Sequence, residues 1–285
     1  MNTFSYLKGI HHRAWPEGFV FLTQSERFLR SVFPSSKAKL LAQVGNRGVL
    51  VGGKFFHLEY FTGDQQPEVC RKKGVCLQIW SRLQAKRPKG WLALPDFLSR
   101  GAVGIVDLRQ ISIQYWETWS QYGRRYRRRW LQQDQYKIER VSREEFVKAY
   151  QKCTLKKSLV EMFSLSLKHY EDVYERDIYF WVAREERSSH IIAGLAVVYD
   201  QETKQTFHPA AFILPEAKKT YAQVGLMDHW FAESQKMSGI DFLNLGVMWR
   251  QVDPPAWKGY SEFKTHFSPG VFLFRAPLLR FFWNR

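Results

Sequence analysis

The chain has 285 residues, and its 43 Lys and Arg residues against 27 Asp and Glu give a formal net charge of +16 at pH 7. Hydrophobic residues make up 45% of it, too many for a disordered polymer and enough for a folded core. No apolar stretch approaches the about 18 to 20 residues of a membrane-spanning helix, and the first 25 residues lack an uninterrupted signal region. We expect a cytoplasmic protein whose basic surface attracts phosphate-rich ligands or anionic lipid.

The cysteine content argues against both a disulfide framework and a zinc site. Cys70, Cys76 and Cys153 are the cysteines of the chain. They are few, they lack C-x-x-C spacing, and they have no partner histidine at a fixed offset. We therefore expect a reducing compartment and no metal site.

The first part of the chain is rich in strand signals. Residues 25–33 predict a short helix. Residues 39–44 and 49–56 flank the turn residues 45–48 and predict a hairpin. Residues 105–108 predict a strand that leads into a helical region.

This helical region is both aromatic and basic. On a helix, aromatic side chains three or four residues apart form one stripe, and these are Tyr115, Trp119, Tyr122, Tyr126 and Trp130. Gly123 weakens or splits the helix. Four arginines lie toward the other side, namely Arg124, Arg125, Arg128 and Arg129. They form either a solvated face over an aromatic core or a surface that binds phosphate groups.

The second half of the chain predicts a sheet covered by helices. Ser142 and Glu145 form a capping box that starts a helix over 143–152. Three β-rich runs predict an antiparallel meander, at 178–185, 191–200 and 205–214. A loop over 215–225, a helix over 226–239 and another strand over 240–247 follow it. The last strand, helix and strand form a βαβ unit, in which the loop before the helix opens a ligand crevice. We predict an α/β (α+β) fold, a mixed sheet with packed helices.

Several catalytic motifs are absent or incomplete. Gly48 to Lys54 has the spacing of a P-loop, but Phe55 stands where Ser or Thr should bind magnesium, and the segment follows a strand pattern. The chain has no G-x-S-x-G and no H-E-x-x-H sequence. We interpret His208 as a half-buried strand residue. Asp228 and His229 would open the crossover helix, where an acidic residue favours the positive end of the helix dipole.

The segment from 257 to 267 combines acidic, basic and aromatic residues in a specific order. If it is extended, Lys264 lies between Glu262 and His266 on one face, with Phe263 and Phe267 on the other. An edge strand with a charged outer face is the alternative interpretation.

The order of these features resembles the Fem-type (FemAB-like) peptidyltransferases of the GNAT-like acyltransferase superfamily. The resemblance covers residues 105 to 275, from IVDL through GIDFLNLGV to the EFKTHF run, and the opening FVFLTQSERFLRSVF also resembles the family. It implies two GNAT-like lobes, a reduced N-terminal one at 1–110 and an acyltransferase lobe at 111–285. It also implies transfer of an aminoacyl group from aminoacyl-tRNA to an amine of a peptidoglycan precursor.

The same resemblance suggests roles for individual residues. Lys264 matches a lysine that stabilises charge in the transition state, and Phe263 supplies backbone contact to the donor. Candidate substrate-binding residues surround the expected crevice, namely Lys218, Lys219, Tyr221, Asn244, Trp257, Lys258 and His266. The arginines at 124, 125, 128 and 129 are candidates for contacts with tRNA. No cofactor is expected besides the donor.

Three alternatives remain open. The donor could instead be acyl-CoA or an acyl carrier protein, with a small amine as acceptor. The chain could also be an inactive basic module that binds RNA or an anionic surface. Residues 276–285 are aromatic and basic, and either lie against a bilayer surface near a lipid-linked acceptor or pack into the core.

Overall fold

A computed structural model gives the structure of the protein. It describes residues 15–32, 38–43, 46–52, 55–70, 73–82, 86–94, 101–155, 157–250, 253, 255, 258–274 and 276–284. The chain forms two compact units. The first contains Met1–Gly104, Val247–Ser261 and Val271–Arg285, and the second contains Ile105–Gly246 and Glu262–Gly270. The sequence-based division at residue 110 differs from this arrangement because the chain returns to the first unit after residue 246.

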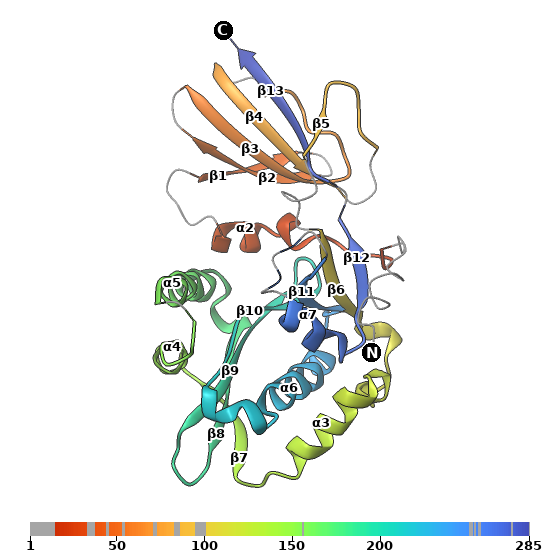
Figure 1. The fold of residues 1–285 in the computed structure, drawn as a ribbon. Coiled ribbons are helices and arrows are strands. Elements are labelled where there is room, and N and C mark those ends of the chain that lie inside the picture. The colour runs from red at the N-terminus through yellow and green to blue at the C-terminus, as the bar shows by residue number, and fades with distance from the viewer. Residues whose placement is uncertain are drawn as a thin grey trace. The chain divides into compact units, whose positions relative to one another are not determined.

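The first unit contains a six-stranded sheet (Figure 1). In spatial order its strands are β1 (Ala38–Gln43), β2 (Asn46–Gly52), β3 (Phe56–Gly63), β4 (Gly74–Ser81), β13 (Leu278–Asn284) and β5 (Leu92–Ala93). β3 and β4 are parallel and the other pairs are antiparallel. The predicted hairpin is therefore present, but its second strand begins at Asn46, so residues 46–48 of the predicted turn lie in β2. Gly48, the first glycine of the P-loop-like segment, lies in strand β2, as the strand pattern predicts, and Gly53 and Lys54 lie outside the described residues.

The C-terminal strand β13 lies inside this sheet, between β4 and β5. Leu278 is completely buried and packs with Phe61, Trp80 and Trp91. Part of the C-terminal run is thus core, as one of its two interpretations predicts. Before the sheet, η1 (Leu22–Gln24) precedes the predicted N-terminal helix α2 (Glu26–Val32), whose first turn is capped where the Phe28 backbone N–H donates to Ser25 Oγ.

The other sheet has seven strands and carries most of the second unit. Its spatial order is β12 (Gly270–Leu273), β6 (Ala102–Asp107), β11 (Phe242–Met248), β10 (Gln205–Ile213), β9 (Ile191–Asp200), β8 (Ile178–Glu185) and β7 (Tyr136–Val141). β8, β9 and β10 form the predicted antiparallel meander, and β10 runs parallel to β11. The predicted mixed sheet and βαβ unit are therefore confirmed.

Helices cover both faces of this sheet, since every residue of β9 is buried. α6 (Ala222–Lys236) packs on β8, β9 and β10, with α3 (Gln121–Leu131) against it. α4 (Arg143–Tyr150) and α5 (Lys157–Tyr174) pack on β8 and β9 from the opposite side (Figure 1). The short helices η3 (Leu108–Gln110), η4 (Tyr115–Thr118), η5 (Glu175–Asp177) and η6 (Pro215–Lys219) connect these elements. None of the helices in the described ranges is long and apolar enough to cross a bilayer.

The aromatic and basic segment is interrupted where the sequence predicts one stripe. Tyr115 lies in η4, Ser120 caps the first turn of α3, and Trp119 lies between them in extended conformation. Gly123 does not split α3, because it lies in the first turn, where its backbone N–H donates to Ser120 Oγ at 3.1 Å. A Cβ at this position would come within 2.7 Å of the His266 carbonyl oxygen. The predicted stripe thus divides into buried Trp119 and Trp130 and exposed Tyr122.

Two local predictions are wrong. Residues 258–265 form helix α7 (Lys258–Thr265) where the sequence analysis considers an extended segment. The burial of Ser261, Lys264 and Phe267 at every third residue follows helical periodicity. Asp228 does not open the crossover helix either, because α6 begins at Ala222.

Candidate functional site

The parallel pairing of β10 with β11 ends abruptly inside the second unit. Only Gln205, Thr206 and Phe207 pair with β11, and the last partner there is Asn244. Beyond that point β10 continues along β9 with a bulge between Phe207 and Ala210. Ligands of open α/β sheets bind where neighbouring strands part at their carboxyl ends, so this opening is the candidate site.

His208 lies in the bulge at this opening. Its Nε2 is 3.3 Å from the Leu245 carbonyl oxygen on β11, and its ring packs edge-on against Trp230 of α6. Burial, and after it the positive charge of Lys264, lowers the pKa of His208 to about 3. The imidazole is therefore neutral at physiological pH.

Lys264 reaches the same opening from α7. It is only 4% exposed, and its Nζ is 3.6 Å from the place that a Cβ on Gly246 would take. Gly246 has a φ of 74°, a left-handed conformation that suits glycine. Burial lowers the pKa of Lys264 to about 7, so both protonation states of the amine are present at neutral pH.

Asn244 holds the end of β11 in shape. Its Nδ2 donates to Gln205 Oε1 at 3.0 Å, and its Oδ1 accepts from the Gly246 backbone N–H at 2.9 Å. These bonds fix the turn of the chain beside the Lys264 ammonium. Asn244 thus acts on the backbone in this structure.

The geometry places one buried amine and one neutral imidazole where the ladder between two strands ends. A buried ammonium stabilises negative charge much more strongly than one in water, because the local dielectric is low. The neutral form of the same amine accepts a proton near pH 7. The opening can therefore support chemistry in which a carbonyl oxygen becomes negative or an amine loses a proton.

Two predicted residues next to Lys264 along the chain have mainly packing contacts. The ring of Phe263 meets that of Phe267 edge to face at 5.0 Å and packs against the core. His266 Nδ1 is 3.1 Å from Ser120 Oγ, and burial lowers the pKa of His266. Since Ser120 caps α3, His266 connects α7 to α3. We call α3 the arginine helix, because it carries Arg124, Arg125, Arg128 and Arg129.

Tyr221 belongs to the same neighbourhood as the arginine helix. Arg129 Nη1 donates to Tyr221 Oη at 2.6 Å, and the Tyr221 ring stacks on Tyr126 with centroids 5.1 Å apart. The guanidinium of Arg125 lies over Tyr126 as well, 5.3 Å from its centroid. The structure thus brings the predicted crevice tyrosine together with two of the predicted phosphate-binding arginines.

The remaining predicted residues are more scattered. Arg124 and Arg128 are exposed on α3, and Arg124 donates to the Glu117 carbonyl oxygen at 2.9 Å. Lys218 and Lys219 are exposed in η6. The Nζ of Lys258, at the start of α7, lies 5.6 Å from the centre of the Trp249 ring in the first unit. Trp257 lies outside the described residues.

A separate cavity of about 850 Å³ lies between α3, α6 and the segment that follows β6. Asp228 lines it and accepts from Arg127 Nε at 2.6 Å and from Tyr115 Oη at 2.8 Å. The guanidinium of Arg127 also lies 4.0 Å from the Trp116 ring. Because Asp228, Arg127 and Tyr115 bind one another, they hold α6 to the neighbouring segments.

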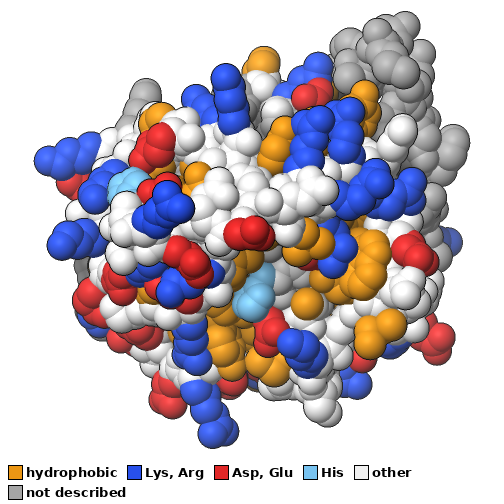
Figure 2. All heavy atoms as spheres, turned by 90° about the horizontal axis from the view of Figure 1, so that it is seen from below, with side chains coloured by type: hydrophobic (Ala, Val, Ile, Leu, Met, Phe, Trp, Pro, Cys, Tyr) orange, Lys and Arg blue, Asp and Glu red, His pale blue; other side chains and the backbone are white. Residues whose placement is uncertain are grey.

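Figure 2 shows that hydrophobic side chains gather next to a histidine on the face seen from below, with Lys and Arg around them.

Sequence reasoning missed His208 and Gly246 as parts of the site. The role of each residue depends on its backbone, since His208 lies in a bulge and Gly246 has a left-handed conformation. Pro209 directly after His208 was the available signal, because proline inside a strand favours a bulge.

Comparison with solved structures identifies the fold. FemX covers 92% of this chain and 92% of its own, with a TM-score of 0.67 and 8% identity. L-PGS from Bacillus licheniformis covers 87% and 85%, with a TM-score of 0.50 and 11% identity. The C-terminal domain of a candidate lysylphosphatidylglycerol synthetase from Agrobacterium fabrum covers 90% and 88%, with a TM-score of 0.51 and 12% identity. No family model matches the chain, and no curated protein matches its sequence. The chain therefore shares the fold of FemX, as the resemblance stated in the sequence analysis predicts.

Proposed function

We propose that this protein is an N-acyltransferase of the Fem type, which moves an aminoacyl group from an activated ester to an amine acceptor. The observation that carries the proposal is the buried Lys264 amine at the point where β10 and β11 separate. The likeness to FemX supports the same class of reaction.

Aminolysis of an ester needs few groups from the protein. The acceptor nitrogen attacks the carbonyl carbon, and the C–N bond forms while the carbonyl oxygen becomes negative. The Lys264 ammonium stabilises that oxygen. The C–O ester bond then breaks, the nitrogen loses a proton, and the leaving hydroxyl gains one. In this proposal the backbone at Phe263 contacts the donor, and Lys218, Lys219 and Tyr221 contribute to substrate binding.

The arginine helix supports aminoacyl-tRNA as the donor. Ser120, the cap of α3, contacts His266, two residues after Lys264. Its exposed arginines therefore start near the proposed reaction centre. Phosphate contacts supply most of the affinity of proteins for nucleic acids. A peptidoglycan precursor is the proposed acceptor, on the strength of the Fem-type resemblance.

The test follows the transfer of a labelled aminoacyl group. Purified protein is incubated with charged tRNA or labelled acyl-CoA and a panel of amines, and the labelled product is measured. We expect transfer from tRNA, and Lys264→Met should lower it by about 10² to 10³ fold. Lys157→Met, which removes an exposed lysine of α5, is the control. Transfer from acyl-CoA alone would favour the second donor class, and equal turnover of Lys264→Met would remove Lys264 from the mechanism.

A binding module without activity is the non-enzymatic alternative. It predicts no transfer from any donor, together with RNA binding that Lys264→Met leaves unchanged. The transferase predicts that this substitution affects turnover much more than binding.

We also propose a peripheral membrane contact through β13. Phe281 is 62% exposed and Trp283 is 72% exposed, and both lie on the face opposite the buried Leu278. Phe56, two strands away in the register of Trp283, is also exposed. Aromatic side chains on a basic protein favour the surface of an anionic bilayer.

Liposome flotation tests this contact with substitutions rather than truncation, because removing 276–285 would delete an internal strand. Phe281→Ser with Trp283→Ser should reduce flotation on anionic vesicles. Met162→Ser with Leu165→Ser changes two exposed apolar residues of α5 and is the control. Equal flotation of both double variants would refute the contact.

A further inference from the structure

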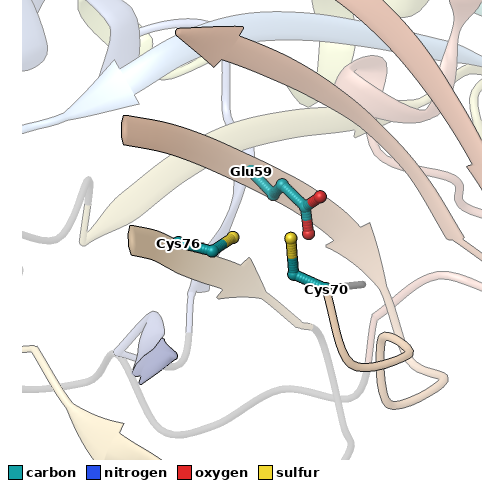
Figure 3. A group of neighbouring side chains, drawn as sticks. All are labelled: Glu59, Cys70 and Cys76. Atoms are coloured by element: carbon teal, nitrogen blue, oxygen red, sulfur yellow. The ribbon is translucent and has the colours of Figure 1, made fainter. Parts of the chain in front are cut away.

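A second cluster of chemically active side chains lies in the first unit, on one face of its sheet. Glu59 comes from β3, Cys76 from β4, and Cys70 from the segment between them. One carboxylate oxygen and the two sulfur atoms all lie within 4.8 Å of one another, and all three residues are buried. Figure 3 shows these groups pointing toward one another.

The strand register explains why the groups meet. β3 and β4 are parallel, and Glu59 lies directly opposite Gln78 on β4. Cys76 precedes Gln78 by two residues, so both side chains point to the same face of the sheet. Cys70 reaches this face from the segment that follows β3. The spacing of the two cysteines alone does not indicate this site, because the third group comes from another strand.

The buried polar side chains around the cluster are already ordered. Gln78 Nε2 donates to Glu59 Oε2 at 2.5 Å and to the Glu68 carbonyl oxygen at 2.9 Å. Arg280 of β13 donates to Gln78 Oε1 at 2.7 Å and to the Pro67 carbonyl oxygen at 2.7 Å. The segment that carries Cys70 is therefore fastened to the sheet, and the Glu59 carboxylate has a fixed orientation.

We propose that Cys70, Cys76 and Glu59 bind one zinc-class divalent cation, which ties the segment before β4 to the sheet. Two sulfur atoms and one carboxylate oxygen form a donor set that zinc accepts, and a water molecule completes the tetrahedron. Ligand atoms bonded to zinc at about 2.0 to 2.3 Å lie about 3.3 to 3.8 Å apart. The three atoms, which lie within 4.8 Å of one another, therefore need to approach by no more than about 1.5 Å.

The charges also balance. Binding displaces the two thiol protons to solvent, so the cation is surrounded by two thiolates and one carboxylate. The resulting group has a net charge of −1, which the Arg280 guanidinium beside Gln78 neutralises. Gln78 does not bind the cation in this proposal. Its hydrogen bond to Glu59 orients the carboxylate that does.

The experiment measures metal bound by the full-length chain, purified with its thiols reduced. We expect one equivalent of zinc per chain by elemental analysis. Titration with Co²⁺ should produce the charge-transfer absorption of sulfur–cobalt bonds, which reports thiolate ligands without any substitution. Cys70→Ser and Cys76→Ser should each lose this absorption. Cys153→Ser, which changes the cysteine of the second unit, should retain it.

Two further variants keep the test valid even if a cysteine variant fails to fold. Glu59→Gln keeps the side-chain volume and should weaken zinc binding at least about tenfold. Gln78→Ala should weaken it by about 10 to 100 fold, as the loss of an outer partner does. Circular dichroism checks that each variant is folded.

Three outcomes would overturn the proposal. In one, the folded, reduced chain binds neither Zn²⁺ nor Co²⁺ with micromolar affinity, and both thiols react freely. In another, the chain binds metal but Cys70→Ser and Cys76→Ser bind it equally well. A Cys70–Cys76 disulfide that forms with peroxide, without any metal affinity, would also overturn it and identify a redox pair instead. None of these results affects the proposed acyl transfer, which rests on the other unit.

Discussion

The charge of Lys264 acts on the ring of His208 at the end of the β10–β11 ladder. Burial first, and then this charge, lowers the pKa of His208 to about 3, and burial lowers the pKa of Lys264 to about 7. Between about pH 3 and pH 7 the pair contains one cation, and that cation is the lysine. This division of charge between the two residues determines how stability and activity should respond to pH.

Stability should depend on pH through Lys264. The pKa of the lysine is about 7 in the folded chain and near 10.4 in the unfolded chain. Between these values the unfolded state binds the extra proton, so the free energy of unfolding rises with pH by about 1.4 kcal/mol per unit. Lys264→Met lacks this dependence. Denaturant unfolding of both proteins from pH 6 to 9 should show that the advantage of Lys264→Met shrinks above pH 7, whereas parallel curves would contradict burial of the charge.

The rate of acyl transfer should fall on the alkaline side with an apparent pKa near that of Lys264. The ammonium form is the one that stabilises the oxyanion, and it is lost as pH rises. The acid limb should move with the pKa of the chosen amine acceptor, while the alkaline limb stays in place. His208→Gln should keep the alkaline limb, because His208 is neutral throughout. A rate that rises through this range independently of the acceptor would make Lys264 a general base.

The sequence predicts the strands and helices well because their periodicities are local. The meander and the βαβ unit follow from alternating and helical apolar patterns. The boundaries of their strands agree closely with the structure, whereas the crossover helix begins at Ala222, four residues before its predicted start. The prediction for the segment around Lys264 is wrong because the segment is short and its sequence fits both the strand periodicity and the helical periodicity. Its helical character shows in the burial of Ser261, Lys264 and Phe267, which depends on tertiary packing.

The candidate site is less predictable, since it depends on contacts between distant segments. Lys264 is found through its motif, but the depressed pKa comes from burial that no local pattern shows. His208 is identified in sequence only as a strand residue, because its importance comes from the place where β10 leaves β11. The cluster of Glu59 with Cys70 and Cys76 requires the parallel register of β3 with β4, which spacing cannot give.

Gly225→Ala should destabilise the second unit. A Cβ on Gly225 would come within 2.2 Å of the Trp130 ring, which lies between α3 and α6. Overpacking of this kind costs about 1 to 3 kcal/mol. Gly259→Ala in α7 is the matched control, since nothing lies within 4 Å of its Cβ and alanine favours a helix. Thermal or denaturant unfolding should show a loss for the first variant and no loss for the second.

Asp228→Asn should weaken the contact between α6 and α3. It leaves the partly buried Arg127 with a neutral partner, and a hydrogen bond to a charged group contributes about 1.5 to 3 kcal/mol. Glu161→Gln, which changes an exposed pair with Lys157, should cost less than about 0.5 kcal/mol. Denaturant unfolding measures both. Equal effects would mean that Asp228 and Arg127 contribute no more than an exposed ion pair.

The arginine helix should control the salt dependence of RNA binding. Replacing Arg124, Arg125, Arg128 and Arg129 with Gln removes four exposed or tyrosine-supported cations from α3. Each phosphate contact contributes about 0.7 to 0.9 to the slope of log K against log salt, so the slope should decrease by roughly 3. The control replaces four exposed cations elsewhere with Gln, Lys157, Lys168, Arg176 and Arg187, and removes the same net charge. If both quadruple variants lose the same slope, net charge alone drives binding and α3 is only a solvated face.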